Sequence, residues 1–481
     1  MLEYLPLILG AFYILLEIVA IIAAIEALLT ARTPQGAIAW GLFLIMFPIL
    51  GLPFYFIFGG RKFSGYIDAR RSGNLPLQKI VQEVSQKLSP KVRASFNEDE
   101  DNYVVLSELA RMPFFAHNNS RLLIDGEATF EAIFAAIKNA KEYILVQFYI
   151  VKDDELGRAL QQHLIDKVRD GVRVYFLYDA IGCHKLSANY LQTLRDAGAE
   201  AVAFRGSGRT GGHPFRINFR NHRKIVVVDG HTAYVGGHNV GNEYVGKSDN
   251  PNLRPWRDTH VEVCGPAALG VQLAFLEDWY WATQQVPTLS MEPVYAYEHS
   301  QRVLVLPSGP ADDLDTCGLL FTELIHSARQ RIWIVSPYFV PDNTVVSALQ
   351  LAALRGVDVR IMLPEKPDHK LIYLAKYSYL EETLPFGIKV YNYHTGFLHQ
   401  KVVLVDNAIA GVGTANLDNR SFRLNFEITL LFVDKGCVSG VEEMLEQDFA
   451  NCHQMELKDI EQRPLWFKIA TRIARLFAPV L

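Results

Sequence analysis

The stretch His222-Arg-Lys224-Ile-Val-Val-Val-Asp229, with Gly236-Gly-His-Asn239 after it, decides the fold of this chain because it occurs twice. The second copy is His399-Gln-Lys401-Val-Val-Leu-Val-Asp406, with Gly413-Thr-Ala-Asn416 after it, and both copies follow the pattern H-x-K-x4-D-x6-G-x-x-N. The four residues between each lysine and aspartate are apolar and mostly β-branched, which is typical of a buried strand. Each histidine and lysine therefore precedes a core strand, with the two side chains on the same side of the chain.

These residue types suit chemistry at a phosphodiester. Imidazole can act as nucleophile or general acid, the ammonium group can neutralise a phosphoryl oxygen, and the asparagine amide offers further donors. One match of this pattern would be weak, but two matches with identical spacing are specific. The doubled motif resembles the phospholipase D superfamily, in which two such motifs build one active site, and we expect this chemistry to need no metal or other cofactor.

The composition limits the classes of protein that fit. The chain has 481 residues, 50% of them hydrophobic, and a formal net charge of −5. This length predicts two or three domains, and the acidic balance disfavours a nucleic-acid binder. The 5 cysteines are scattered without C-x-x-C spacing, which predicts reduced thiols in the cytosol and no zinc site.

Two apolar runs near the amino terminus, 5–29 and 36–58, are each long enough to cross a bilayer core. The turn between them is short, so we expect a transmembrane hairpin of two helices. Arg32 is the one basic residue up to the end of the second run, whereas several follow soon after it: Arg61, Lys62, Arg70, Arg71 and Lys79. The positive-inside rule then predicts a multi-pass protein of the inner membrane with its catalytic region in the cytoplasm.

The rest of the chain is expected to form a linker and two similar halves. Residues 61–118 are largely polar, as in a linker. Beyond them the order helix, strand, helix, strand occurs in 119–290 and again in 300–455, and the short apolar strands indicate α/β layering. We therefore predict an α/β fold of two pseudo-symmetric phospholipase D-like halves, packed so that both motifs form one active site.

A reacting imidazole needs a carboxylate on its far nitrogen, because the carboxylate fixes the tautomer and stabilises the cation. When the strands after the two asparagine motifs are aligned, Asp258 corresponds to Glu427. We predict that Asp258 orients His222 and that Glu427 orients His399. Glu243 is the alternative partner in the first half.

The aspartates that end the two motifs, Asp229 and Asp406, lie where each core strand meets a turn. A carboxylate in a turn commonly accepts hydrogen bonds from nearby backbone N–H groups. Both belong to the motifs and are counted with the site, but we interpret them as structural groups and not as proton carriers.

The segment 456–481 contains a basic amphipathic helical pattern. Its apolar face is formed by Trp466, Ile469, Ile473 and Phe477, whereas Lys468, Arg472 and Arg475 lie off this face. Such a helix is typical of an anionic bilayer surface, and it is equally typical of a helix packed on a catalytic domain. The sequence leaves both alternatives open.

Further blocks make the resemblance more specific: Arg32-Thr-Pro, Ser308-Gly-Pro310, Pro337-Tyr-Phe-Val-Pro341 and the stretch from Asn416 to Glu427. From end to end the chain resembles the bacterial cardiolipin synthases of the phospholipase D type. His394 and Gln400 depart from that pattern, at positions that are not expected to touch the reacting groups.

The resemblance implies transfer of a phosphatidyl group between two phosphatidylglycerol molecules, giving cardiolipin and glycerol. It implies that His222 attacks phosphorus and that His399 protonates the departing glycerol and then deprotonates the acceptor. The groups expected to hold the non-bridging oxygens are Lys224, Lys401, Asn239 and Asn416. A phospholipase D or phosphatidylserine synthase with another acceptor is the alternative, and a membrane-anchored nuclease fits less well. Membrane lipid is the expected partner and nucleic acid is not, while a homo-oligomer is left open.

Overall fold

The computed structural model describes the chain except for residues 1–3, 32–33, 60–91, 97–100, 206–218 and 297–300. It contains two compact units, the first formed by 1–71 and 206–219 and the second by 72–205 and 220–481. The basic residues that orient the hairpin, Arg61 to Lys79, lie outside the described residues. So does much of the expected linker 61–118.

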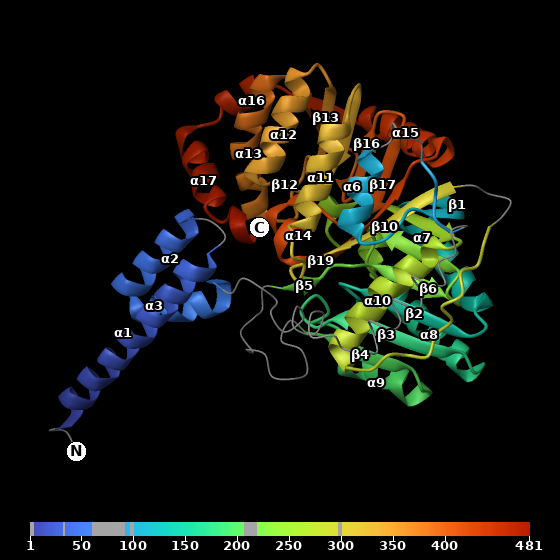
Figure 1. The fold of residues 1–481 in the computed structure, drawn as a ribbon, viewed down its shortest axis with the longest axis horizontal. Helices are drawn as coiled ribbons and strands as arrows, with labels where there is room; N and C mark the ends of the chain where they lie inside the picture. The colour runs from blue at the N-terminus through green and yellow to red at the C-terminus, as the bar shows by residue number, and fades with distance from the viewer. Residues whose placement is uncertain (1–3, 32–33, 60–91, 97–100, 206–218, 297–300) are drawn as a thin grey trace. The chain divides into compact units, whose positions relative to one another are not determined.

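The first unit is a hairpin of apolar helices (Figure 1). Helix α1 (Leu5–Thr30) packs against α2 (Pro34–Met46) and α3 (Pro48–Phe54). Its buried side chains are small: Ala20, Ala23 and Ala27. Small residues let helix backbones approach closely, which is the usual way helices associate in membranes. Helix α1 is long and apolar enough to span a bilayer.

The second apolar run is broken and is not the single helix that the run 36–58 predicted. Phe47 has a non-helical φ of −135°, and Pro48 follows it as the first residue of α3. Proline has no N–H and clashes with the preceding turn, so a helix cannot continue through it without distortion. A π-helical turn, Tyr55–Gly59, follows α3. Within the described residues, α1 alone is a single helix of membrane-spanning length.

The second unit is built on one mixed sheet of 16 strands among the described residues. The order is β20-β14-β13-β11-β16-β17-β19-β10-β1-β9-β7-β6-β2-β3-β4, with β5 paired to β19, and two separate pairs are β12-β18 and β15-β8. The strands are β1 (Phe115–Ile124), β2 (Tyr143–Phe148), β3 (Arg173–Asp179), β4 (Glu200–Phe204), β5 (Arg220–Asn221), β6 (Ile225–Val228), β7 (Thr232–Gly236), β8 (Trp256–Arg257), β9 (Thr259–Cys264), β10 (Gln301–Ser308), β11 (Arg331–Val335), β12 (Phe339–Val340), β13 (Asp358–Pro364), β14 (Lys389–Tyr393), β15 (Phe397–Leu398), β16 (Val402–Val405), β17 (Ile409–Gly413), β18 (Leu417–Asp418), β19 (Asn425–Phe432) and β20 (Cys452–Met455).

The sheet repeats itself about its centre, where β1 and β10 pair antiparallel. Outward from β1 lie β9, β7, β6, β2, β3 and β4, and outward from β10 lie their counterparts β19, β17, β16, β11, β13 and β14. In each half the last three of these strands are parallel. The motif strands β6 and β16 are buried along their whole length, as their apolar sequences predict. The prediction of two pseudo-symmetric α/β halves is confirmed.

Helices pack on this sheet in both halves (Figure 1). They are α6 (Asp101–Ala110), α7 (Asp125–Asn139), α8 (Glu155–Arg169), α9 (Ala188–Ala197), α10 (Ala267–Thr283), α11 (Thr316–Ser327), α12 (Asn343–Leu354), α13 (Lys370–Thr383), α14 (Asn419–Arg423), α15 (Lys435–Phe449), α16 (Leu457–Glu461) and α17 (Leu465–Arg475), with 3-10 turns η3 (Asn242–Val245), η4 (Pro251–Leu253), η5 (Leu384–Phe386) and η6 (Ala478–Val480). Helix α6 comes from the segment expected as a linker, and its Tyr103, Leu106 and Ala110 lie in the core with side chains of the second half.

Candidate active site

His222 is placed by a short strand that joins the other half of the unit. Strand β5, directly before it, pairs in parallel with the start of β19, and the His222 N–H donates to Phe426 O at 2.9 Å. This pairing sets the imidazole beside the next residue of β19. The Nδ1 atom of His222 lies 2.9 and 3.0 Å from the two carboxylate oxygens of Glu427.

His399 is placed in the same way by the opposite pair of segments. Strand β15 pairs in parallel with β8, and the His399 N–H donates to Arg257 O at 2.8 Å. The next residue after β8 is Asp258, and its Oδ2 lies 2.7 Å from Nδ1 of His399. Each histidine therefore meets a carboxylate of the other half.

The prediction that Asp258 orients His222 and that Glu427 orients His399 was wrong in its pairing. The repeat identified the two carboxylates correctly as partners of the histidines, but it assumed that each half completes its own pair. The parallel pairs β5-β19 and β15-β8 cross between the halves and carry the acids with them. The alternative acid Glu243 is an ion-pair partner of Lys152, at 2.5 Å.

Both histidines are held as neutral imidazoles in the free site. Burial lowers the pKa of His222 to about 4 and the pKa of His399 to about 3, despite the neighbouring carboxylates. A neutral ring that donates from Nδ1 to a carboxylate carries its lone pair on Nε2. That lone pair is the form of imidazole that can attack phosphorus or accept a proton.

The two motif lysines are buried next to the histidines. Lys224 Nζ donates to His222 O at 2.7 Å. Lys401 Nζ donates to His399 O and lies 2.9 Å from Nδ1 of the same residue. Burial lowers the pKa of Lys224 to about 7 and the pKa of Lys401 to about 8. A bound anion would raise both pKa values and so hold the lysines in their charged form, because it compensates for the lost solvation.

The two carboxylates stay ionised, although they are buried. Burial by itself would raise the pKa of Asp258, but Lys401 and the neighbouring histidines bring the net pKa below its usual range. Burial also acts to raise the pKa of Glu427, and its interaction with His222 reverses this, so that the pKa is lowered. Two ionised acids and two lysines thus leave the free site close to electrical neutrality.

The carboxylates differ in their other hydrogen bonds. Glu427 accepts from three side chains: Thr414 Oγ1 at 2.6 Å, Ser421 Oγ at 2.8 Å and Asn425 Nδ2 at 3.1 Å. Asp258 accepts from the Thr259 N–H at 2.8 Å and Trp256 Nε1 at 3.4 Å. Gly237 occupies the position of Thr414 in the first half, and a Cβ there would lie 1.9 Å from Oδ1 of Asp258. The pseudo-symmetry is therefore only approximate at the acids.

The motif aspartates fasten the ends of the core strands. Asp229 accepts from the N–H groups of 141, 142 and 143 at 2.8 to 2.9 Å, and Asp406 accepts from those of 329, 330 and 331 at 2.7 to 2.9 Å. Both have a positive φ, 51° and 50°. These contacts support the interpretation of both aspartates as structural groups, which stays a prediction, and the donors come from distant segments and not from the adjacent turns.

The two motif asparagines are buried beside these strands. Asn239 accepts from the Ile150 N–H at 3.1 Å and donates to Tyr244 Oη at 3.1 Å. Asn416 donates its N–H to Ser421 Oγ at 3.1 Å, and its Oδ1 has no hydrogen-bond partner within the described residues. Their assignment to phosphoryl oxygens stays a prediction.

Two buried acids that the sequence analysis missed support the histidines from behind. Asp278 on α10 accepts from Asn221 Nδ2 at 2.7 Å and Arg223 Nη1 at 2.9 Å, so it holds the residues on both sides of His222. Asp448 on α15 accepts from Gln400 Nε2 at 2.8 Å and from Arg257 Nε, also at 2.8 Å.

Gln400 therefore does contribute to the site, by fixing the backbone beside His399. A signal for both acids was present in the sequence. Asp278 and Asp448 follow the orienting acids Asp258 and Glu427 by 20 and 21 residues, each on the helix after the strand.

No group of three or more histidine, cysteine, aspartate or glutamate side chains is arranged for a metal ion in the part of the chain that the structure describes.

The fold and the site together define a protein of the phospholipase D class, with one catalytic centre assembled from two repeats. Residues 133–256 and 321–449 match the family described as cardiolipin synthase, phospholipase D-like domain, and residues 18–60 match the phospholipase D-nuclease N-terminal family. The chain belongs to the cardiolipin synthase family of phospholipase D-like proteins.

Curated relatives match over the whole length. Cardiolipin synthase A of Pseudomonas fluorescens is 48% identical over 479 residues, which cover 99% of each chain. Cardiolipin synthase A of Pseudomonas putida is 48% identical over 480 residues, covering 99% of this chain and 98% of the relative. Among solved structures, phosphatidylserine synthase of Haemophilus influenzae covers 79% of this chain and 100% of its own, with a TM-score of 0.59 and 18% identity. At that identity the structural likeness supports the fold.

Proposed function

We propose that this protein is a cardiolipin synthase, a phosphatidyltransferase that moves a phosphatidyl group from one phosphatidylglycerol to another. The observation that carries the proposal is the pair of neutral imidazoles, each oriented by a carboxylate of the other half. One imidazole can hold the phosphatidyl group while the other moves protons, which is what a two-step transfer needs. The full-length relatives named cardiolipin synthase A support this acceptor over others.

In the first step His222 Nε2 attacks phosphorus, the N–P bond forms, and the bond from phosphorus to the glycerol oxygen breaks. His399 donates the proton that leaves with glycerol. A phosphodiester adds one negative charge to a site whose two lysines and two carboxylates balance, so binding raises the pKa of His399 and favours its protonation. Substrate and proton are thus taken up together.

In the second step the free glycerol hydroxyl of another phosphatidylglycerol attacks the same phosphorus. His399, now neutral, accepts the hydroxyl proton, and the N–P bond to His222 breaks to give cardiolipin. Lys224 and Lys401 stabilise the charge on the non-bridging oxygens, with amide donors from Asn239 and Asn416. The proton from the acceptor hydroxyl replaces the one that left with glycerol, so His399 is protonated again, as it was when the first lipid bound.

The choice of His222 as nucleophile rests on the family resemblance. Both imidazoles have the same tautomer, and the pKa order, about 4 for His222 and about 3 for His399, does not by itself favour His399 as the acid. Covalent trapping decides the assignment: lipid mapped by mass spectrometry to His399 in the His222→Ala protein would reverse the roles.

We infer that the protein lies in the inner membrane through a two-pass hairpin, with the catalytic unit on the cytoplasmic side. The apolar length of α1 and the match of 18–60 support membrane attachment, and the basic residues after the second run support the orientation. A reporter that is active only in the periplasm, fused after Leu481, should be silent. A strong periplasmic signal would contradict the orientation.

The proposed reaction is tested with purified full-length protein and phosphatidylglycerol as the sole lipid. We expect cardiolipin and glycerol in equal amounts. Phosphatidic acid without cardiolipin would instead indicate a hydrolytic phospholipase D, and a product formed when serine is offered with a cytidine-activated lipid would indicate a phosphatidylserine synthase. His399→Ala is the matched inactive control, because it keeps the membrane anchor and removes the proposed proton carrier. Gel filtration of the same preparation tests the homo-oligomer.

A further inference from the structure

Helix α17 has one face that packs on the catalytic unit and one that does not. Phe467, Thr471 and Ala474 are buried, and the Phe467 ring meets Tyr377 of α13 edge-on at 5.0 Å between centroids. A backbone carbonyl of the same face, that of Thr471, accepts from Ser378 Oγ at 3.2 Å. The helix is thus fixed on α13, as the packed alternative in the sequence analysis requires.

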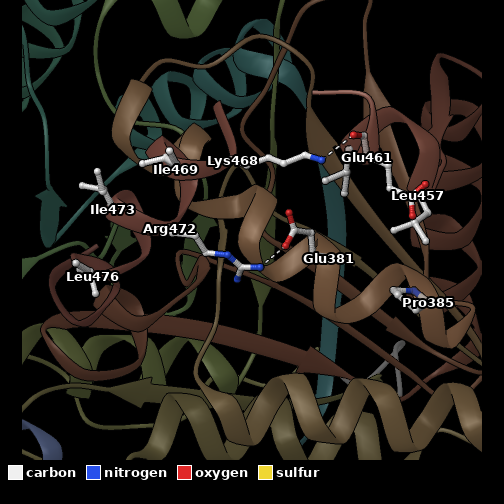
Figure 2. Close-up of a pocket in the computed structure, with 10 residues that line it drawn as sticks. Glu381, Pro385, Leu457, Glu461, Lys468, Ile469, Arg472, Ile473 and Leu476 are labelled. Atoms are coloured by element: carbon white, nitrogen blue, oxygen red, sulfur yellow. Dashed lines mark hydrogen bonds and ion pairs between the residues drawn. The ribbon is translucent and has the colours of Figure 1, made fainter. Parts of the chain in front are cut away.

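The opposite face of α17 is apolar and exposed. Trp466 is 68% exposed, Ile469 51% and Ile473 53%, and Leu476, just after the helix, is 78% exposed. Figure 2 shows the last three in a row along the helix. They line one side of a groove of about 790 Å³ between α17, α16 and the end of α13. These side chains follow one line along the helix, whereas the exposed apolar residues that need no explanation are scattered singly over a surface.

Two of the three cations of α17 are paired with acids inside the unit. Arg472 pairs with Glu381, and Arg475 pairs with Glu382, both on α13. Lys468 Nζ donates to Glu461 O at 2.8 Å (Figure 2). Attraction to anionic lipid is therefore largely neutralised, and what the face offers to a partner is apolar surface.

The segment after α17 is attached close to the catalytic site. Arg420 of α14 donates its N–H to Leu481 O at 2.8 Å and its Nη1 to Val480 O at 3.0 Å. The next residue, Ser421, donates to Glu427, the acid that orients His222. Any surface that binds α17 is therefore kept near the catalytic histidines.

We propose that the exposed face of α17 lies in the plane of a phospholipid bilayer, with its apolar side chains among the acyl chains, and brings the catalytic site to its lipid substrate. A tryptophan at one end of an apolar face flanked by cations is typical of an interfacial helix. Because two of the three cations are internally paired, this docking depends mainly on apolar burial and only weakly on salt and on anionic lipid.

A second copy of the chain is a poorer occupant of this face. The 11 residues of α17 span roughly 16 Å at about 1.5 Å per residue, so a strip about 10 Å wide covers roughly 160 Å². A stable dimer buries about 800 Å² on each partner. A bilayer has no such minimum, because its surface extends on all sides of the helix.

Lipid-borne quenching tests the proposal on the full-length protein reconstituted in phosphatidylcholine vesicles. A bimane label is placed at Ile469→Cys, with Leu354→Cys as the matched control, because Leu354 is a 68% exposed leucine at the end of α12. Ile14→Cys in α1 is the positive control, and labelled protein without an added cysteine gives the background. A doxyl group near the carbonyl end of the acyl chain should quench the label at 469 and at 14, and leave that at 354 unquenched.

Quenching at 469 should persist from about 0.05 M to about 0.5 M salt, a range over which screening weakens electrostatic attachment. A label at 469 that behaves like the one at 354 would overturn the proposal. Disulfide formation between copies at 469, in place of quenching, would overturn it in favour of a dimer. Loss of quenching at high salt would overturn the apolar mechanism.

A second set of variants excludes an effect of folding. In Leu476→Cys protein, the double change Ile469→Glu/Ile473→Glu should abolish quenching at 476, whereas Leu351→Glu/Leu354→Glu on α12 should not change it. Both double variants should unfold at the temperature of the parent, since all four side chains are exposed by half or more. Quenching that survives the α17 substitutions would also contradict the proposal, and none of these readouts depends on the proposed reaction.

Discussion

Exchange of Glu427 for glutamine tests the crossed pairing of acids and histidines. Oε1 of Glu427 accepts from Ser421 Oγ and Asn425 Nδ2, and Oε2 accepts from Thr414 Oγ1. The NH₂ group of Asn425 can donate a hydrogen bond but cannot accept one. In Glu427→Gln the atom that faces it, at the Oε1 position, is therefore the amide oxygen. The NH₂ group then takes the Oε2 position, 2.9 Å from Nδ1 of His222, while the amide oxygen, 3.0 Å from Nδ1, is already occupied by its bonds from Ser421 and Asn425.

The substituted amide donates to Nδ1, and the imidazole proton moves to Nε2. The lone pair that should attack phosphorus is lost, although size and packing are almost unchanged. Reversal of the tautomer in the serine protease triad costs on the order of 10⁴ in rate. We expect a similar loss in cardiolipin formation, which corresponds to about 5.4 kcal/mol in activation free energy.

The assay uses a phosphatidyl ester of p-nitrophenol, which needs no general acid to leave. Glu427→Gln should behave like His222→Ala and release no burst of nitrophenolate. Asp258→Asn should behave like His399→Ala and release about one equivalent, followed by slow turnover, because the acceptor cannot be deprotonated. If Glu427→Gln grouped with His399→Ala, the crossed pairing would be refuted, whichever histidine carries the lipid.

Three further changes have expected outcomes. Asp229→Ala removes the acceptor of three backbone N–H groups and places alanine at a φ of 51°. The free energy of unfolding in urea should therefore fall by about 3 kcal/mol. Each molecule that folds should keep its activity. Gly237→Ala sets a Cβ against Oδ1 of Asp258, so it should reproduce the burst of Asp258→Asn, and wild-type turnover would contradict the contact. Because the pKa of Lys224 is lowered to about 7 and that of Lys401 to about 8, both lose their positive charge as the pH rises through these values. The kcat/KM should therefore fall above about pH 8, and a profile flat to about pH 10 would show that the lysines keep ordinary pKa values.

The sequence by itself determined the local structure of the motifs. Four apolar, mostly β-branched residues between lysine and aspartate favour a short core strand, so β6 and β16 followed from composition and spacing. The doubled pattern determined the repeat. The strands depend on neighbours within a few residues along the chain, whereas the N–H groups that Asp229 binds, those of 141 to 143, lie more than 80 residues away and were decided by the tertiary structure.

The tertiary structure alone decided which acid serves which histidine. The segments that meet, 220–221 with 425–426 and 397–398 with 256–257, are two residues long and more than 100 residues apart, so no periodicity marks them. The break at Pro48 was visible as a proline, but its effect on the second apolar run depended on how the chain resumed after it. Of the two alternatives for α17, packing on the catalytic unit is confirmed for one face, whereas contact of the exposed face with lipid stays a proposal. A helical pattern shows that a helix has an apolar face, but which part of that face is covered depends on the surface against which the helix packs.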